Sequence, residues 1–151
     1  MMGNLKELYQ EVILDHNRSP RNFREIADTP HHAEGHNPLC GDNITVWVEL
    51  DGDVISDASF IGNGCAISKA SASLMTQAVK GKRVSEAKEL FKSFQKLVTG
   101  RVSPEESKDL LGKLILFAGV SQFPVRVKCA SLSWHTMNAA LEDAAEPVTT
   151  E

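Results

Sequence analysis

The stretch 43-NITVWVELDGDVISDASFIG-62 decides the fold. Its first half alternates between apolar and other residues, and the apolar positions are Ile44, Val46, Val48 and Leu50. Asp51-Gly52 is a strong two-residue hairpin signal, and the chain then returns as a second strand. The stripe of that second strand is formed by Val54, Ala58 and Phe60, diluted by Ser56. We therefore expect an antiparallel hairpin in which one face is apolar.

Helical periodicity lies on both sides of this hairpin. An amphipathic helix opens the chain, and Pro20 follows its end. After the hairpin, residues 65–80 form a helix that Gly81 ends, and a third helix follows over residues 84–97. A capping box with proline at the first helical position, 103-SPEE-106, starts a fourth helix. A last helix follows Pro124.

This order of elements predicts an α+β domain with a small antiparallel sheet. A length of 151 residues suits one domain. We place that domain at residues 1–145 and expect residues 146–151 to form a loose tail. Residues 27–41 resemble a loop in which a short strand could lie.

Composition excludes several classes of function. The formal net charge of -4 offers no basic surface for nucleic acid. No apolar run approaches the roughly 18 residues of a membrane span, and the N-terminus lacks the apolar core of an export signal. We therefore expect a cytoplasmic protein without a membrane partner. In that compartment, three well-separated cysteines favour metal binding or thiol chemistry over disulfides.

The three cysteines occupy similar places in the predicted structure. Cys40 lies in a loop just before a strand, whereas Cys65 follows a strand and the glycines of "GNG" at the start of a helix. Cys129 follows the loop that bears Pro124, again at the start of a helix. Helix N-termini lower thiol pKa values. With Asp42, the chain offers three sulfurs and one oxygen, which suits tetrahedral Zn²⁺.

Other interpretations stay open at this point. Free cysteines are commonly buried as small apolar residues, and the chain contains no Cys-x-x-Cys pair. The run 31-HHAEGH-36 could hold a metal ion through His31, His32 and His36, or it could be a solvated loop. His16 and His135 are isolated, which favours surface or packing roles.

Four motifs carry a resemblance to a known family, and they span nearly the whole chain in order. They are 7-ELYQEVILDHNRSPRN-22, 37-NPLCGDNI-44, 62-GNGCAISKASAS-73 and 123-FPVRVKCASLSWHTM-137. Together they resemble the IscU/NifU-like iron–sulfur cluster assembly proteins. The resemblance implies a three-stranded antiparallel sheet packed by about five helices. It also implies that Cys40, Asp42, Cys65 and Cys129 converge at one exposed end of the fold.

Departures from the scaffold members of that family point to its SufU branch. Scaffold members carry a histidine before the third cysteine, in a proline-rich motif, whereas this chain has Lys128 and only Pro124 there. It also has an extra segment around residues 82–103. SufU members are zinc-dependent acceptors of sulfur from a pyridoxal-phosphate cysteine desulfurase. The resemblance therefore implies sulfur transfer toward a downstream iron–sulfur scaffold.

By this resemblance, Cys40 is the thiolate that takes sulfur from the desulfurase persulfide. Arg126 and Lys128 lie near the site in sequence and could steer an anionic partner, or they could be ordinary surface charges. Two alternatives remain: a scaffold that assembles a [2Fe–2S] cluster on the same ligands, and a structural zinc domain without chemistry.

Overall fold

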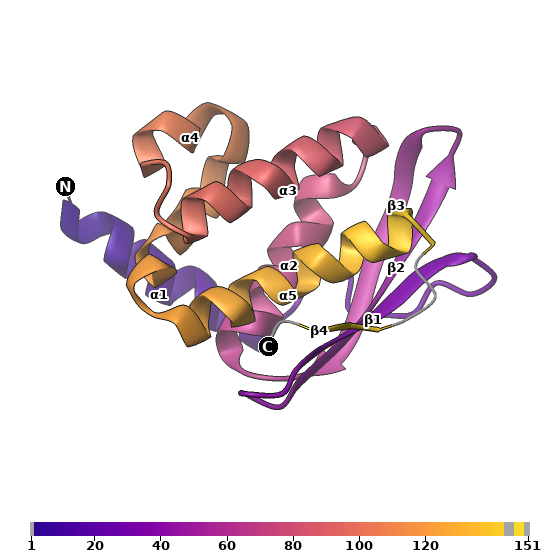
Figure 1. The fold of residues 1–151 in the computed structure, drawn as a ribbon, viewed down its shortest axis with the longest axis horizontal. Helices are drawn as coiled ribbons and strands as arrows, with labels where there is room; N and C mark the ends of the chain where they lie inside the picture. The colour runs from indigo at the N-terminus through magenta and orange to yellow at the C-terminus, as the bar shows by residue number, and fades with distance from the viewer. Residues whose placement is uncertain (1, 144–146, 150–151) are drawn as a thin grey trace.

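The structure, a computed structural model, describes residues 2–143 and 147–149, with side chains from Lys6 onward. Across these ranges the chain forms five α-helices, one 3₁₀-helix and a four-stranded sheet (Figure 1). The helical elements are α1 (Met2–Arg18), α2 (Ala66–Val79), α3 (Val84–Val98), α4 (Pro104–Leu111), η1 (Gly112–Gln122) and α5 (Pro124–Leu141). The strands are β1 (His31–Asn37), β2 (Asp42–Asp51), β3 (Val54–Asn63) and β4 (Val148–Thr149). The predicted α+β class is confirmed.

The sheet has the strand order β3-β2-β1-β4. β2 pairs antiparallel with both β1 and β3, as expected, but β4 pairs parallel with β1 through Gly35–Val148 and His36–Thr149. The described sheet therefore has four strands instead of the expected three. Part of the predicted tail over residues 146–151 lies outside the described residues. Its residues 148 and 149 are held at the sheet edge rather than loose, because backbone pairing satisfies their polar groups.

The central hairpin forms with two local differences from the prediction. Its loop is Gly52-Asp53, one residue later than expected, with Gly52 at a φ of +64°. The pairing also skips Ser56, because Leu50 pairs with Ile55 and Glu49 with Asp57. This β-bulge reverses the alternation before it. Ile55, rather than the predicted Val54, is therefore fully buried.

The segment that resembled a loop contains the strand β1, which packs beneath α5. Its buried positions are Ala33, Gly35 and Asn37. A Cβ atom on Gly35 would lie 2.0 Å from the hydroxyl oxygen of Thr136, so only glycine allows α5 to approach this closely. Because the inward residues are small or polar, the alternation of this strand carried no apolar signal.

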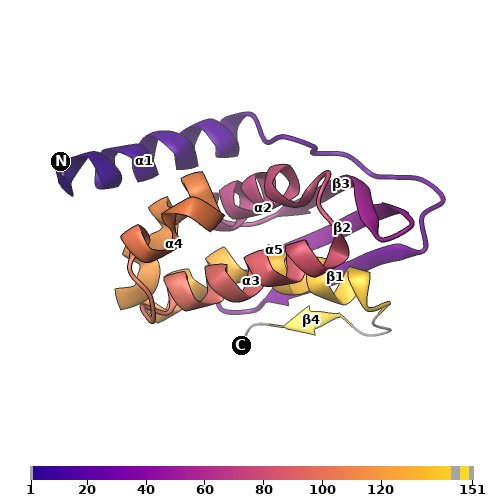
Figure 2. The ribbon, with the colours of Figure 1, turned by 90° about the horizontal axis from the view of Figure 1, so that it is seen from above.

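The helices lie on one side of the sheet. α2 and α5 pack against its strands, whereas α1 lies along α2 and α3 lies along α5 (Figures 1 and 2). The core is fully buried around Trp134, whose ring stacks on Phe94 with centroids 4.8 Å apart. The predicted capping box is confirmed, with Ser103 as the N-cap of α4. Among the described residues, no helix has both the length and the apolar character needed to cross a bilayer.

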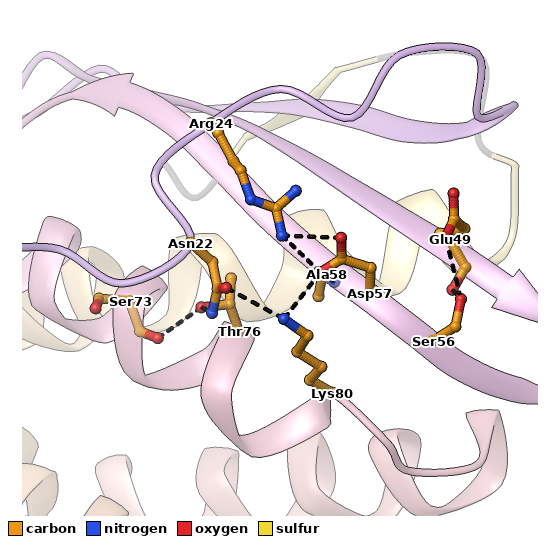
Figure 3. A network of polar contacts seen from close by, with 9 residues as sticks. All are labelled: Asn22, Arg24, Glu49, Ser56, Asp57, Ala58, Ser73, Thr76 and Lys80. Atoms are coloured by element: carbon orange, nitrogen blue, oxygen red, sulfur yellow. Dashed lines mark hydrogen bonds and ion pairs between the residues drawn. The ribbon is translucent and has the colours of Figure 1, made fainter.

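A polar network fastens the segment between α1 and β1 to the sheet and to α2 (Figure 3). Asp57 on β3 binds Arg24 at 2.8 Å and Lys80 at 3.2 Å. Asn22 donates from its amide to the hydroxyl of Thr76 at 3.0 Å. These contacts fix the path of the chain after α1, so α1 is held along α2 beside the cysteine-bearing end of the fold.

Candidate metal centre

Three of the four predicted ligands converge where β2 begins. One ligand atom each from Cys40, Asp42 and Cys129 lies within 4.8 Å of the other two. The sulfurs of Cys40 and Cys129 are 3.3 Å apart. The β1–β2 loop supplies Cys40, β2 supplies Asp42, and α5 supplies Cys129. Cys65 does not belong to this compact group, but it adjoins it through the backbone.

Asp42 is the fixed centre of the arrangement. Its side chain is only 1% exposed. One oxygen, Oδ1, accepts a hydrogen bond from the backbone N–H of Cys65 at 2.8 Å. The other, Oδ2, accepts from the amide of Asn37 at 3.2 Å. A buried carboxylate needs such donors, and here they orient it toward the two nearby sulfurs.

Cys65 is the N-cap residue of α2, as its predicted place at a helix start implied. Its sulfur accepts a hydrogen bond from the backbone N–H of Ser68 at 3.4 Å. Hydrogen bonding from the thiol of Cys129, together with backbone N–H groups of the first helical turn, lowers the pKa of Cys65 to about 7. A half-buried thiolate is therefore readily formed at this position.

Cys129 differs from its prediction. Helix α5 begins at Pro124, so Cys129 lies in the second turn and not at the N-terminus. It is 2% exposed. Its hydrogen bond to Cys65, its burial and its contact with Cys40 all raise the pKa of the Cys129 thiol. In the metal-free protein Cys129 is therefore the protonated partner, and its thiol can donate its one hydrogen to the sulfur of Cys40, 3.3 Å away.

Cys40 is the exposed member of the set. It lies in a four-residue loop, 38–41, between the paired residues Asn37 and Asp42. Gly41 follows it with a φ of +70°, and a Cβ atom there would meet nothing within 4 Å. Among the described residues, no backbone or side-chain N–H donates to the Cys40 sulfur. The loop therefore presents this sulfur at the surface with few restraints.

Asn37 is a site residue that sequence reasoning missed. It is fully buried, and its amide nitrogen also lies 3.5 Å from the sulfur of Cys129. The only available signal was an inward-facing polar residue at the end of a strand. Because residues 27–41 resembled a loop, that orientation was not recognised.

The histidines do not gather into a site. His31 contacts Asp143 at 2.9 Å, and His36 contacts Asn43. His32 is exposed. Within the described ranges these three histidines take part in no group of closely spaced metal ligands. Alternation along β1 places His31 on the face opposite His32 and His36, and these two are four residues apart along the strand.

The two predicted steering residues have different surroundings. Arg126 is exposed, and its guanidinium lies 4.4 Å from the centre of the Phe123 ring. With Tyr9 and Gln10 it lines two cavities of about 470 and 490 Å³. The second cavity is also lined by Ile67, two residues after Cys65. Burial raises the pKa of Tyr9, Arg126 opposes this effect, and Cys65 and Cys129 add to it. Lys128 is half-buried and forms no ion pair within the described part of the chain.

The donor set suits a zinc ion. Zinc–sulfur bonds of about 2.3 Å in a tetrahedral site place two sulfurs about 3.8 Å apart. The observed separation of 3.3 Å between Cys40 and Cys129 is close to that value. Cys65 would supply the fourth ligand from the N-cap of α2. Two thiols that can lose their protons and one carboxylate lie within 4.8 Å of one another. This grouping suits a divalent cation better than it suits a purely packing role.

Comparisons with known proteins identify a family and several similar proteins. The family described as the NifU-like N terminal domain matches residues 8–130. The zinc-dependent sulfurtransferase SufU of Bacillus subtilis is 45% identical over 135 residues, which cover 89% of this chain and 90% of that protein. The iron–sulfur cluster assembly scaffold protein IscU of Streptococcus pyogenes is 40% identical, over 95% of this chain and 89% of that protein.

A solved structure agrees with these matches. The crystal structure of FiSufU, from the thermophilic Fervidobacterium islandicum, superimposes with a TM-score of 0.82 at 36% identity. The match covers 89% of this chain and 97% of that one.

Proposed function

Because the chain belongs to the NifU-like N-terminal domain family, we propose that it serves iron–sulfur cluster biogenesis as a zinc-dependent acceptor of sulfur from a pyridoxal-phosphate cysteine desulfurase. Its 45% identity to a protein named as a zinc-dependent sulfurtransferase supports the SufU type of activity. The single observation that carries the proposal is the contrast among the cysteines. Cys40 is exposed on a short loop, whereas Cys65 is held as the N-cap of α2 and Cys129 lies within α5.

In the proposed reaction, Cys40 is the nucleophile. Its thiolate attacks the outer sulfur of the desulfurase persulfide and forms a new S–S bond. The S–S bond of the desulfurase breaks, and its cysteine leaves as a thiolate. Cys40 then carries the sulfur as a persulfide, with no net oxidation or reduction. The exposed loop 38–41 allows this approach, because a partner can reach Cys40 without opening the core.

The other ligands remain in place during this step. Zn²⁺, when bound, would keep the cysteines deprotonated and order the loop. Asp42, Cys65 and Cys129 would hold the ion, and the backbone contact between Cys65 and Asp42 ties two of them together. Arg126, beside the apolar hollow near the cysteines, would attract the negatively charged persulfide and its surroundings.

A second function uses the same ligands. Three sulfurs and a carboxylate could also hold a [2Fe–2S] cluster, and the 40% identity to a scaffold protein favours this alternative. In that function the sulfur would be delivered for cluster assembly on the protein itself. The downstream scaffold would then be unnecessary.

The experiment combines metal analysis with sulfur mapping. The protein is purified without oxygen and its zinc, iron and sulfide are quantified. It is then incubated with a pyridoxal-phosphate cysteine desulfurase and cysteine, alkylated, digested and analysed by mass spectrometry. We expect about one zinc per chain and one added sulfur on the Cys40 peptide. Cys40→Ser should fold, keep the other two cysteines unmodified and abolish the added mass.

Each alternative has its own result. Iron and sulfide in equal amounts would favour the scaffold, whereas zinc without any added sulfur would favour a structural zinc domain. Persulfide on the Cys129 peptide, with Cys40 unmodified, would contradict the assignment of the carrier.

A further inference from the structure

We infer that Asn37 is a positioning residue of the metal centre: its amide holds Asp42 and Cys129 in place while Cys40 leaves to carry sulfur. The departure of Cys40 rests on the proposed function. The holding of Asp42 and Cys129 does not, because it follows from contacts within the protein.

Asn37 is placed to contact three of the predicted ligands. It pairs with Asp42 across β1 and β2, and this pair closes the loop that carries Cys40. Its carbonyl oxygen accepts a hydrogen bond from the backbone N–H of Cys40 at 3.2 Å. Its side-chain nitrogen donates to Asp42 at 3.2 Å and lies 3.5 Å from the sulfur of Cys129. One residue thus links the sheet, the loop and α5.

The chemistry of the amide suits ionised ligands. An NH₂ group has two hydrogens and no lone pair to offer, so it can donate to a carboxylate and to a thiolate at once. The reversed amide would place its oxygen against the carboxylate of Asp42, which is repulsive. The observed orientation leaves the side-chain oxygen of Asn37, Oδ1, buried without a hydrogen-bond partner among the described residues. That penalty is consistent with a side chain whose orientation is set by the two acceptors.

The donation also separates the roles of two neighbouring sulfurs. A hydrogen bond to a thiolate stabilises its lone pairs and makes it a poorer nucleophile. Cys129 is buried, and its sulfur, which would be a thiolate with the metal bound, accepts from the Asn37 amide at 3.5 Å. Cys40 is exposed, its sulfur lies beside that of Cys129, and its only hydrogen bond with Asn37 among the described residues runs from its own N–H to the backbone carbonyl. When the loop swings out, this backbone bond and the contact between the sulfurs of Cys40 and Cys129 are lost, whereas the bonds from the Asn37 amide to Asp42 and Cys129 remain.

The test replaces Asn37 on β1, and a matched control replaces Asn43 on β2, the strand that pairs with β1. Asn37→Leu has a similar volume and no donor. Asn43→Leu is the control, because Asn43 follows Asp42 but lies exposed, against His36. Zinc affinity is measured by chelator competition. Absorption spectra of the Co²⁺-loaded protein report the thiolate-to-metal charge transfer. Each substitution is also made together with Cys40→Ser, which removes the departing ligand permanently.

We expect the zinc dissociation constant to rise about 10- to 100-fold for Asn37→Leu and to change less than about twofold for Asn43→Leu. The charge-transfer band of Asn37→Leu should move to longer wavelength, because its thiolate lone pairs are less stabilised. The loss should be larger in the Cys40→Ser background. Equal affinities and equal spectra for Asn37→Leu and the parent would overturn the inference.

Folding is controlled separately. The melting temperature of each metal-free variant is measured, and Asn37→Ser, which keeps one donor, provides a milder change. A positioning role predicts that Asn37→Ser binds zinc with intermediate affinity and melts near the parent when metal-free. If both variants are unfolded with and without zinc, Asn37 is a determinant of the fold and the inference is wrong. Sulfur transfer by the unaltered protein is scored independently, so failure of the proposed function is distinguishable from failure at Asn37.

Discussion

Asp42 accepts a hydrogen bond from the backbone N–H of Cys65 over 2.8 Å, which joins the first residue of β2 to the N-cap of α2. The two residues are far apart in sequence, and their contact closes one side of the candidate metal centre. It requires the Asp42 side chain to approach closely the backbone that precedes α2. Gly64 makes this possible, because a Cβ atom there would lie 2.5 Å from the Oδ1 atom of Asp42.

The first prediction is that Gly64→Ala displaces Asp42. A methyl group at that distance forces the buried carboxylate to move and breaks its hydrogen bond to Cys65. We expect a loss of about 2 kcal/mol in the free energy of unfolding, the scale of a hydrogen bond to a charged group. Zinc affinity should fall at least about tenfold. Denaturant unfolding and chelator competition measure the two effects.

Gly81→Ala is the matched control for this substitution. Gly81 follows α2 with a φ of +85°, and a Cβ atom there would meet nothing within 4 Å. Backbone strain should destabilise the fold by about 1 kcal/mol without changing zinc affinity. Equal zinc affinities for Gly64→Ala and the parent would show that Asp42 is not fixed by this contact.

The second prediction concerns the reactivity of the three thiols without metal. Cys40 is exposed, and the pKa of Cys65 is lowered to about 7, so about half of Cys65 is thiolate at neutral pH. Cys129 is buried with a raised pKa. After chelation at pH 7, iodoacetamide should modify Cys129 at least about tenfold more slowly than Cys40 or Cys65.

Peptide mass spectrometry over time measures the three rates, and the urea-denatured protein serves as the reference. There all three thiols should react at similar rates. Zinc restored before labelling should protect all three cysteines. Labelling of Cys129 as fast as Cys40 in the folded protein would mean that α5 does not bury it.

Much of the fold could be predicted because its signals are local. The hairpin and the capping box at Ser103 are set by short-range turn and cap chemistry, and both formed. β1 and the bulge at Ser56 could not be predicted, because they depend on partners. Gly35 is favoured only by the approach of Thr136 from α5, about a hundred positions further along the chain.

The candidate site divides in the same way. The residue types and the family motifs pointed to Cys40, Asp42, Cys65 and Cys129, and the structure groups three of these closely. The prediction that Cys129 lies at the start of the last helix was wrong, because Pro124 is the first residue of α5 and does not belong to the loop before it. Asn37 was missed, because a donor to two ligands is recognised only when those ligands are seen together.

The third prediction distinguishes Arg126 from Lys128. Arg126 is exposed beside an apolar hollow, whereas Lys128 is half-buried. If a negatively charged persulfide approaches through that hollow, Arg126→Glu should slow sulfur transfer about tenfold at low salt, mainly through a higher KM. Lys128→Glu should have a smaller effect.

Initial rates at several salt concentrations test this idea, because screening weakens steering between exposed charges. The difference between Arg126→Glu and the parent should shrink as salt increases. Arg101→Glu, after α3, controls for the change in net charge. Equal rates for Arg126→Glu and Arg101→Glu would remove Arg126 from the partner surface.

The fourth prediction concerns acid stability and begins with a buried histidine. His16 is 4% exposed, and its Nδ1 atom lies 2.6 Å from the hydroxyl of Ser73 on α2. Burial lowers the pKa of His16, and the positive charges of Arg21 and Lys113 lower it further, against an opposing effect of Asp15. His135, which packs edge-on against Phe91, also has a pKa lowered by burial. Both histidines are therefore neutral in the folded protein at neutral pH.

In the unfolded chain these histidines regain a pKa of about 6.5. Above that pH neither state binds the proton, and the folded protein keeps its full stability. As pH falls below about 6.5, the unfolded state takes up protons first, so the free energy of unfolding decreases until the folded pKa is passed. Each histidine adds a slope of at most about 1.4 kcal/mol per pH unit. His16→Gln, which cannot titrate in this range, should therefore flatten the curve between pH 7 and pH 5, whereas the exposed His32→Gln should not. Urea titrations at each pH measure the free energy of unfolding, and they use the chelated protein so that release of zinc in acid does not contribute. If this free energy falls as steeply with pH in His16→Gln as in the parent, His16 is excluded as a source of the acid sensitivity.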